Sequence, residues 1–205
     1  MADSILPPSF YARDALEVAY DLLGAEIRHG EVRLRITEVE AYRFPDDTAN
    51  HCRMGRTPRN APMWGPPGHA YVYLCYGMHS LLNFVTNTEG EGAAVLIRAC
   101  EPLEGLELVQ ARRGKARGVA LTTGPGRVTK ALGVDTTFSG APLYVPGGLE
   151  VHRGRTPVGA VLAGPRIGID YASPRDRKAP YRLAVAESAY VLKKTALKRV
   201  RGRAS

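Results

Sequence analysis

The sequence has 205 residues, of which 44% are hydrophobic, and its formal net charge is +8. This size suits one domain with its own core, and the 22 glycines and 15 prolines favour a mixed α/β chain with short strands over a helical bundle. Three scattered cysteines without a C-x-x-C pair argue against a disulfide framework and a structural metal site, and there is neither a signal peptide nor an apolar run of about 18 residues. We therefore expect a cytoplasmic protein with reduced thiols.

The first predicted element is a helix over residues 9–23, where apolar residues recur at helical spacing, with Ser9 as its N-cap and Gly24 just past its end. Strands are expected over 25–28 and 32–42, followed by a proline- and glycine-rich loop over 43–70. Further along we expect a hairpin over 71–86, a strand over 93–99, helices over 103–112 and 128–132, and strands over 143–145, 161–169 and 183–186.

Two carboxylates share one face of the predicted strand over 32–42. In a regular strand the even-numbered residues lie on one face, and the apolar residues at positions 32, 34 and 36 mark that face as inward. Glu38 and Glu40 would then stand where the apolar face ends, and desolvation there would make a carboxylate a better general base. The alternative is a buried ion pair, for example between Glu40 and Arg98, and a single β-bulge would reverse the parity.

Residues 71–83 hold three of the ten tyrosines. Two apolar, β-prone runs meet there around Tyr76 and Gly77, which predicts a hairpin with a tight reversal. On a basic protein, an aromatic hairpin tip fits a wedge between stacked bases. An ordinary core hairpin is an equal alternative.

Several basic segments fit contacts to a nucleic-acid backbone, because its phosphates attract clustered Lys and Arg side chains. The loop 55–60 contributes Arg56 and Arg59, and the turn 124–127 contributes Gly124 and Arg127 at an expected helix start. On composition alone, ordinary polar loops explain both segments equally well. Residues 112–117 form another basic cluster, and 193–205 form a basic tail that either contacts phosphates or is frayed and solvated; for 201–205 we expect the frayed state.

Four blocks in fixed order and spacing carry a family resemblance. They are residues 37–42 (Thr-Glu-Val-Glu-Ala-Tyr) followed by His51; residues 55–60 with Met63; residues 71–78 with Asn83; and residues 95–105 (Val-Leu-Ile-Arg-Ala-Cys-Glu-Pro-Leu-Glu-Gly). Residues 123–127 and 164–169 also fit. Over roughly residues 10–192 the sequence resembles a bacterial-type member of the alkyladenine DNA glycosylases, also called 3-methyladenine DNA glycosylases.

The resemblance implies a mixed α+β fold, a single compact domain over residues 1–205 with a curved, largely antiparallel sheet, surrounding helices and a protruding β-hairpin that inserts into the DNA minor groove. It also implies that Glu40 is the general base that activates the attacking water, and that Arg98 lies beside that water. At the hairpin tip, Tyr76 would intercalate and Met78 would press against the minor groove. The base-binding pocket would consist of Tyr42, His51, Tyr73, Asn83 and, by a looser match, Ser188.

The implied activity is that of a DNA repair glycosylase on double-stranded DNA containing damaged purines such as 3-methyladenine and 7-methylguanine. The enzyme would flip the base and hydrolyse its N-glycosidic bond, leaving an abasic site. The resemblance calls for no cofactor and no metal, and no lyase step is expected because no matched pocket residue is a lysine. We expect a monomer associated with the nucleoid through DNA binding. Whether hypoxanthine and ethenoadenine are substrates stays open.

Two positions depart from the family pattern: His79 stands where an aromatic residue is expected, and Trp64 stands where phenylalanine is usual. His79 affects the expected DNA contacts of the hairpin and leaves the catalytic assignment untouched. A non-enzymatic nucleic-acid-binding module is the alternative function, against which Glu40, Tyr42 and Tyr73 argue. A metal-dependent nuclease or deaminase would need a cluster of acids or an H-x-E…P-C-x-x-C signature, and the sequence has neither.

Overall fold

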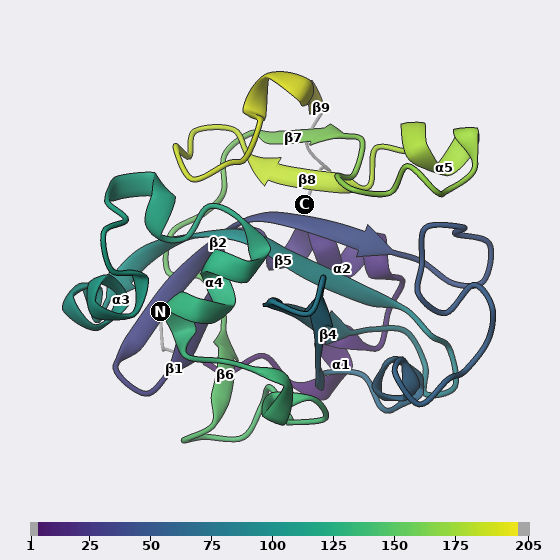
Figure 1. Ribbon diagram of the computed structural model, residues 1–205, viewed down its shortest axis with the longest axis horizontal. Helices are drawn as coiled ribbons and strands as arrows, with labels where there is room; N and C mark the ends of the chain where they lie inside the picture. The colour runs from purple at the N-terminus through teal and green to yellow at the C-terminus, as the bar shows by residue number, and fades with distance from the viewer. Residues whose placement is uncertain (1–3, 201–205) are drawn as a thin grey trace.

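The computed structural model describes residues 4–200 and shows an open antiparallel sheet flanked by short helices (Figure 1). The strands are β1 Glu26–His29, β2 Val32–Tyr42, β3 Ala70–Cys75, β4 His79–Val85, β5 Ala94–Glu104, β6 Leu149–His152, β7 Val161–Gly164, β8 Arg182–Val185 and β9 Lys198–Val200. The α-helices are α1 Pro8–Tyr11, α2 Ala15–Leu22, α3 Leu106–Arg113, α4 Pro125–Leu132 and α5 Pro174–Lys178, and the 3₁₀ turns are η1 Ala61–Trp64, η2 Gly118–Leu121, η3 Thr136–Phe138 and η4 Lys194–Ala196. Within this part of the chain, no helix is long and apolar enough to cross a membrane.

Strand β2 is the branch point of the sheet. The main path runs β3-β4-β5-β2-β8-β7-β9, while β1 pairs with β2 and β6 on a side branch. Along one edge of β2, the first half pairs with β1 over residues 32–35 and the second half pairs with β8 over 38–40. The layer that contains β7 and β8 therefore lies next to the second half of β2, at one end of the molecule (Figure 1). This arrangement confirms the expected single mixed α+β domain with an antiparallel sheet.

The prediction that Glu38 and Glu40 share the inward face of β2 is wrong, because β2 contains a β-bulge. The pairing of β2 with β5 shifts register on both sides of Glu38, where β2 exchanges β1 for β8. The main hydrophobic core accordingly takes its β2 residues at positions 32, 34 and 36 before the bulge, but Val39 and Ala41 after it. An extra residue in one strand moves all later side chains to the opposite face. Glu38 and Glu40 are fully buried, yet they lie on the face opposite the core.

The predicted helix over 9–23 is two helices, because Asp14 interrupts it. The Asp14 side chain accepts a hydrogen bond from the backbone N–H of Leu16 and caps α2, which makes Asp14 the N-cap in place of Ser9. Gly24 follows the helix end with φ +83°, as expected. Residues 15, 18, 19 and 22 of α2 are buried at helical spacing, and α2 packs on β2 while α4 packs on β4 and β5.

The C-terminal third differs most from the sequence prediction. Residues 143–145 form no strand; β6 lies a few residues later, and the strand expected over 161–169 is the shorter β7. The order of the basic segment after residue 192 was left open by the sequence; the segment forms η4 and then β9, which pairs with β7. Residues 201–205, the end of the predicted solvated tail, lie outside the described residues.

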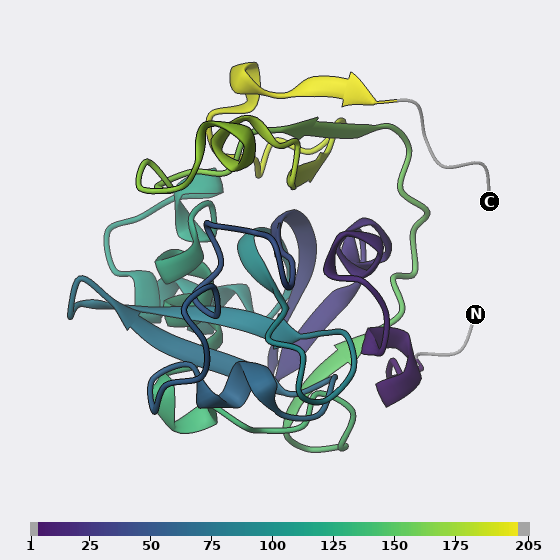
Figure 2. The same ribbon diagram turned by 90° about the vertical axis from the view of Figure 1, so that its right-hand side faces the viewer.

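The predicted hairpin is formed by β3 and β4, and it projects from one side of the molecule (Figure 2). Tyr76 and Gly77 both have positive φ, 51° and 68°, and the N–H of Met78 donates to the carbonyl of Cys75 at 3.1 Å to close the turn. Positive φ is unfavourable for a tyrosine, so the tight reversal carries backbone strain at its tip. Tyr76 is 87% exposed and Met78 is 74% exposed.

Candidate active site

A cavity of about 460 Å³ lies between the hairpin, the second half of β2 and the segment after β7. Its walls are largely aromatic and aliphatic, with a few polar groups. The lining residues are Tyr42, Asn50, His51, Arg59, Met63, Tyr71, Tyr73, Cys75, Tyr76, Leu81, Asn83, Leu96, Arg98, Pro125, Ile167, Gly168, Ile169 and Tyr171. Six residues with expected roles at the cavity, at positions 42, 51, 73, 76, 83 and 98, thus meet here from β2, β3, β4, β5 and two loops.

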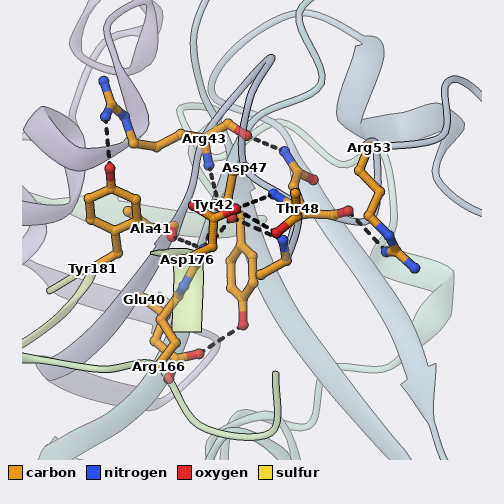
Figure 3. A network of polar contacts seen from close by, with 12 residues as sticks. Glu40, Ala41, Tyr42, Arg43, Asp47, Thr48, Arg53, Arg166, Asp176 and Tyr181 are labelled. Carbon is orange, nitrogen blue, oxygen red and sulfur yellow. Dashed lines mark hydrogen bonds and ion pairs between the residues drawn. The ribbon is translucent and has the colours of Figure 1, made fainter. Parts of the chain in front are cut away.

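The carboxylate of Glu40 lies behind the floor of this cavity. Its Oε2 accepts a hydrogen bond from the hydroxyl of Tyr42 at 2.9 Å (Figure 3). The same oxygen accepts from Arg98 at 3.1 Å, and Oε1 accepts from the backbone N–H of Ile167 at 2.8 Å. Tyr42, Arg98 and Ile167 all line the cavity. Glu40 is therefore fixed by three donors whose residues surround the space that a bound molecule would occupy.

Arg98 joins the two buried carboxylates of β2. Its Nη1 contacts Glu40 at 3.1 Å and its Nε contacts Glu38 at 3.4 Å. Glu38 also contacts Arg182 at 3.4 Å and accepts the N–H of Leu192 at 2.7 Å. Two carboxylates and two guanidinium groups thus balance in charge inside the protein. Burial raises the pKa of Glu38 in spite of the opposing effects of Arg98, the Leu192 N–H and Arg182. The buried ion pair between Glu40 and Arg98, which the sequence left open as an alternative, is present at the edge of the cavity.

Aromatic rings form the other walls. The rings of His51 and Tyr73 meet edge to face at 4.6 Å, and Tyr71 and Tyr73 stack at 5.4 Å. Burial, helped by Arg59 and Arg53, lowers the pKa of His51 to about 4, so this imidazole is neutral at physiological pH. Burial also raises the pKa of Tyr73 well above its usual value. The walls facing Tyr42 are therefore uncharged aromatic surfaces, which suit a flat heteroaromatic ligand.

Asn83 is buried on β4 and lines the same cavity. Its Nδ2 donates to the carbonyls of Tyr71 at 3.1 Å and Leu81 at 3.4 Å. Because both hydrogen bonds go to the backbone of the hairpin, the side chain is held in one orientation. A rigid amide at this place can exclude a ligand substituent on steric grounds.

The four residues expected to contact the DNA backbone lie in different places: one at the cavity, two on the surface and one buried. Arg59 lines the cavity, stacks on Tyr73 at 5.6 Å and donates to the carbonyl of Leu74, while Arg56 is exposed on its loop. Arg127 is exposed at the start of α4 and lines a groove of about 560 Å³ beside the hairpin tip, together with Met78. Gly124 is buried, and its N–H donates to the carbonyl of Arg98. This amide is already bonded within the protein, but Gly124 lines the same groove, and its contact with a DNA phosphate stays a prediction.

Ser188 is not part of the cavity lining. It lies in the loop after β8, and its hydroxyl accepts the N–H of Tyr190 within the same loop. Sequence patterns assigned no role to Asp47, Arg166 and Tyr171. Tyr171 lines the cavity, and the other two pair directly behind it. Arg166 and Ile167 fall in a block that matches the family, and that match was the available signal.

A larger cavity of about 610 Å³ lies between the N-terminal helices and residues 153–158. Its charged side chains are Arg13, Asp21 and Arg153; the carboxylate of Asp21 is exposed and pairs with Arg13 at 2.8 Å, unlike the buried Glu40. We therefore take the smaller cavity as the active site. In the part of the chain that the structure describes, no cluster of three or more His, Cys, Asp or Glu side chains is placed to hold a metal ion.

An aromatic cavity with a buried carboxylate behind it, beside an exposed aromatic hairpin on a basic protein, fits the class of DNA glycosylases. The chain belongs to the methylpurine-DNA glycosylase (MPG) family, whose model matches residues 9–189. It is 63% identical over 187 residues to a protein of Nitrosococcus oceani named "Putative 3-methyladenine DNA glycosylase", covering 91% of this chain and 92% of that protein. It is 54% identical over 188 residues to the DNA-3-methyladenine glycosylase of Arabidopsis thaliana, covering 91% and 74% of the two chains. The protein is a DNA repair enzyme, and DNA is its substrate.

Proposed function

We propose that this enzyme binds double-stranded DNA containing an alkylated purine such as 3-methyladenine or 7-methylguanine, takes the flipped base into the cavity and hydrolyses its N-glycosidic bond. The observation that carries the proposal is the fully buried Glu40, held directly behind an aromatic cavity by Tyr42, Arg98 and Ile167. A base within a duplex is out of reach of such a cavity, so the nucleotide must leave the stack first. A non-enzymatic DNA-binding module would have no use for this carboxylate.

The cavity walls favour a cationic purine. Alkylation at N3 or N7 gives the base a positive charge, and an aromatic face attracts a cation. Because His51 is neutral, with its pKa lowered to about 4, the wall adds no positive charge that would repel the base. Tyr42 on one side, with His51 and Tyr73 on the other, would enclose the ring.

Glu40 would act as the general base. A water molecule beside Glu40 and Arg98 would give a proton to the carboxylate as it attacks C1′, through an oxocarbenium-like transition state. None of the described residues that line the cavity is a lysine, so no amine is placed to form a Schiff base and cleave the strand. This step needs only a carboxylate and a water molecule, and we infer that the enzyme acts as a monomer without a metal or cofactor.

The direct test is excision of 3-methyladenine and 7-methylguanine from methylated duplex DNA in the presence of EDTA, scored as alkali-labile abasic sites. We expect abasic sites to appear with no strand cleavage before alkali is added. Borohydride should trap no covalent protein–DNA product. Failure to release any alkylated purine would exclude the proposed activity, and a trapped product would exclude hydrolysis without a lyase step.

Tyr76 is expected to fill the gap that the flipped nucleotide leaves. The side chain stands exposed at the tip of the β3–β4 hairpin, and stacking of an aromatic ring on a base contributes about 1–3 kcal/mol. Tyr76→Ala should therefore reduce the flipped population about 10-fold and slow excision from a paired duplex. A mismatched lesion should be affected less, because less stacking has to be broken.

This prediction is checked with 2-aminopurine placed next to the lesion, whose fluorescence reports flipping. Tyr76→Phe keeps the ring and serves as the matched control, which should behave like the wild type. An unchanged flipping signal in Tyr76→Ala on the paired duplex would leave the hairpin as an ordinary structural element.

Asn83 is expected to exclude undamaged guanine. Its amide is fixed by Tyr71 and Leu81 at the cavity wall, where it would occupy the space of the 2-amino group of guanine. Asn83→Ala or Asn83→Ser should increase the release of unmodified guanine, while excision of 3-methyladenine changes little. The measurement is the spectrum of bases released from normal and methylated DNA, and an unaltered spectrum would place selectivity elsewhere in the cavity.

A further inference from the structure

A second buried ion pair, formed by Arg166 and Asp47, lies directly behind the cavity. The Arg166 Nη1 is 2.5 Å from one Asp47 oxygen and its Nη2 is 2.7 Å from the other, and both side chains are almost completely buried. The Nη1 also donates to the carbonyl of Ala41 at 2.9 Å. A bidentate pair of this kind fixes the plane of the guanidinium group.

Arg166 supports the ring of Tyr42 from behind. Its guanidinium carbon lies 4.8 Å from the centre of the Tyr42 ring and 5.2 Å from that of Tyr181. Tyr42 lines the cavity and Arg166 does not, so the guanidinium covers the side of the ring turned away from the cavity. The orientation of Tyr42 determines both the aromatic wall and the hydroxyl that donates to Glu40.

The same pair also holds the two chain segments that meet at Glu40. Residue 167, next to Arg166, donates its N–H to Glu40 at 2.8 Å. Asp47 accepts the backbone N–H of Arg43 at 3.1 Å and of Ala49 at 3.0 Å, which shapes the loop leading to His51 (Figure 3). Two of the three donors to Glu40, from Tyr42 and Ile167, thus depend on where Arg166 is placed.

We propose that Arg166 and Asp47 are positioning residues for the hydrolysis step, setting the Tyr42 ring and the Ile167 amide against Glu40. This inference rests on the proposed role of Glu40 as general base. Neither residue lines the cavity, so their loss should lower the rate of the chemical step and leave the affinity for lesion DNA nearly unchanged. A small misplacement of reacting groups can cost about 100-fold in rate.

The test uses the double variant Asp47→Leu/Arg166→Met, with Arg166→Lys as the conservative variant. Removing both partners leaves no unpaired buried charge, so the double variant should fold. We expect its single-turnover excision rate to fall about 10- to 100-fold with Kd for lesion DNA within about 3-fold of wild type. Arg166→Lys keeps the charge but loses the bidentate geometry, and its excision rate should lie between those of the wild type and the double variant.

The matched control is Glu26→Leu/Arg33→Met, which removes another buried pair, with a separation of 2.5 Å, at the far end of β2. This control should change the unfolding midpoint without changing the excision rate. Wild-type excision by the Asp47/Arg166 double variant would overturn the proposal. Should that variant fail to fold, Arg166→Lys decides, and a wild-type rate for it is the contrary result.

Combination with Glu40→Gln separates this inference from the proposed function. If the pair acts through Glu40, adding the double substitution to Glu40→Gln should cost much less than it does alone. A full additional loss would show that the pair does not act through Glu40. If Glu40→Gln itself is as active as the wild type, the proposed function fails, whatever the pair does.

Discussion

Glu40→Gln should lower the single-turnover excision of a neutral damaged purine by about 10²- to 10⁴-fold, the usual loss when a general base is removed. Glutamine has nearly the same shape and can still accept a hydrogen bond, but it cannot take a proton from water. The loss should be smaller for 3-methyladenine and 7-methylguanine, because a cationic base is a better leaving group. The measurement is the rate of base release with enzyme in excess over DNA.

A lesion-binding assay shows whether the Glu40→Gln protein is intact. We expect its affinity for lesion DNA to be retained, because Glu40 lies behind the cavity wall. Glu150→Gln is a matched control, since Glu150 is also a buried carboxylate but lies on β6 with His152 and the Gly147 N–H as partners. Near-normal release of a neutral base by Glu40→Gln would remove this residue from the catalytic role.

Arg98→Met should reduce the free energy of unfolding by about 3–5 kcal/mol at neutral pH, the usual cost of leaving a buried charge without its partner. Arg98 contacts both Glu38 and Glu40, and after its loss only Arg182 would balance the two carboxylates. Urea unfolding of the variant and the wild type measures the difference. Arg155→Met is the control, because Arg155 is half exposed and its pairs with Glu26 and Glu104 should matter far less.

The stability deficit of Arg98→Met should depend on pH. Burial raises the pKa of Glu38 above its ordinary value of 4.5, and Arg98 opposes that shift, so removing Arg98 raises this pKa further. The folded variant then keeps a proton that the unfolded chain has lost, and stability falls as pH rises above the ordinary carboxyl range. The deficit should be smallest near pH 4 and largest at neutral pH. A deficit that is constant across this range would contradict the charge-balance argument.

The sequence predicted the parts of the fold that local patterns encode. The limits of β2 and the β3–β4 hairpin follow from long apolar, β-prone runs, and both are confirmed. The break between α1 and α2 was missed because the apolar stripe continues past Asp14, whose capping bond decides the helix start. The strand β9 has three residues and takes its stability from pairing with β7, so its own sequence carries little signal.

Some residues of the candidate site could be found from the sequence, and others only from the structure. Family blocks pointed to Tyr42, His51, Tyr73, Asn83 and Arg98, and the structure brings these residues together around one cavity. Their roles in catalysis and base binding stay predictions. Asp47 and Arg166 are separated by 119 residues in the chain, so no local sequence pattern predicts a contact between them. The parity argument for Glu40 failed because a bulge depends on the two strands that flank β2, not on β2 alone.

The bulge in β2 also restricts how this gene can change in length. With the bulge kept in place, removing Val39 would shift the rest of the strand by one position and turn Glu40 into the apolar core and Ala41 towards the cavity. Substitutions in this segment act one side chain at a time, whereas a single-codon deletion or insertion exchanges the two faces at once. Length variation should therefore be tolerated in the outer loops and be lethal to both folding and repair in the middle of β2.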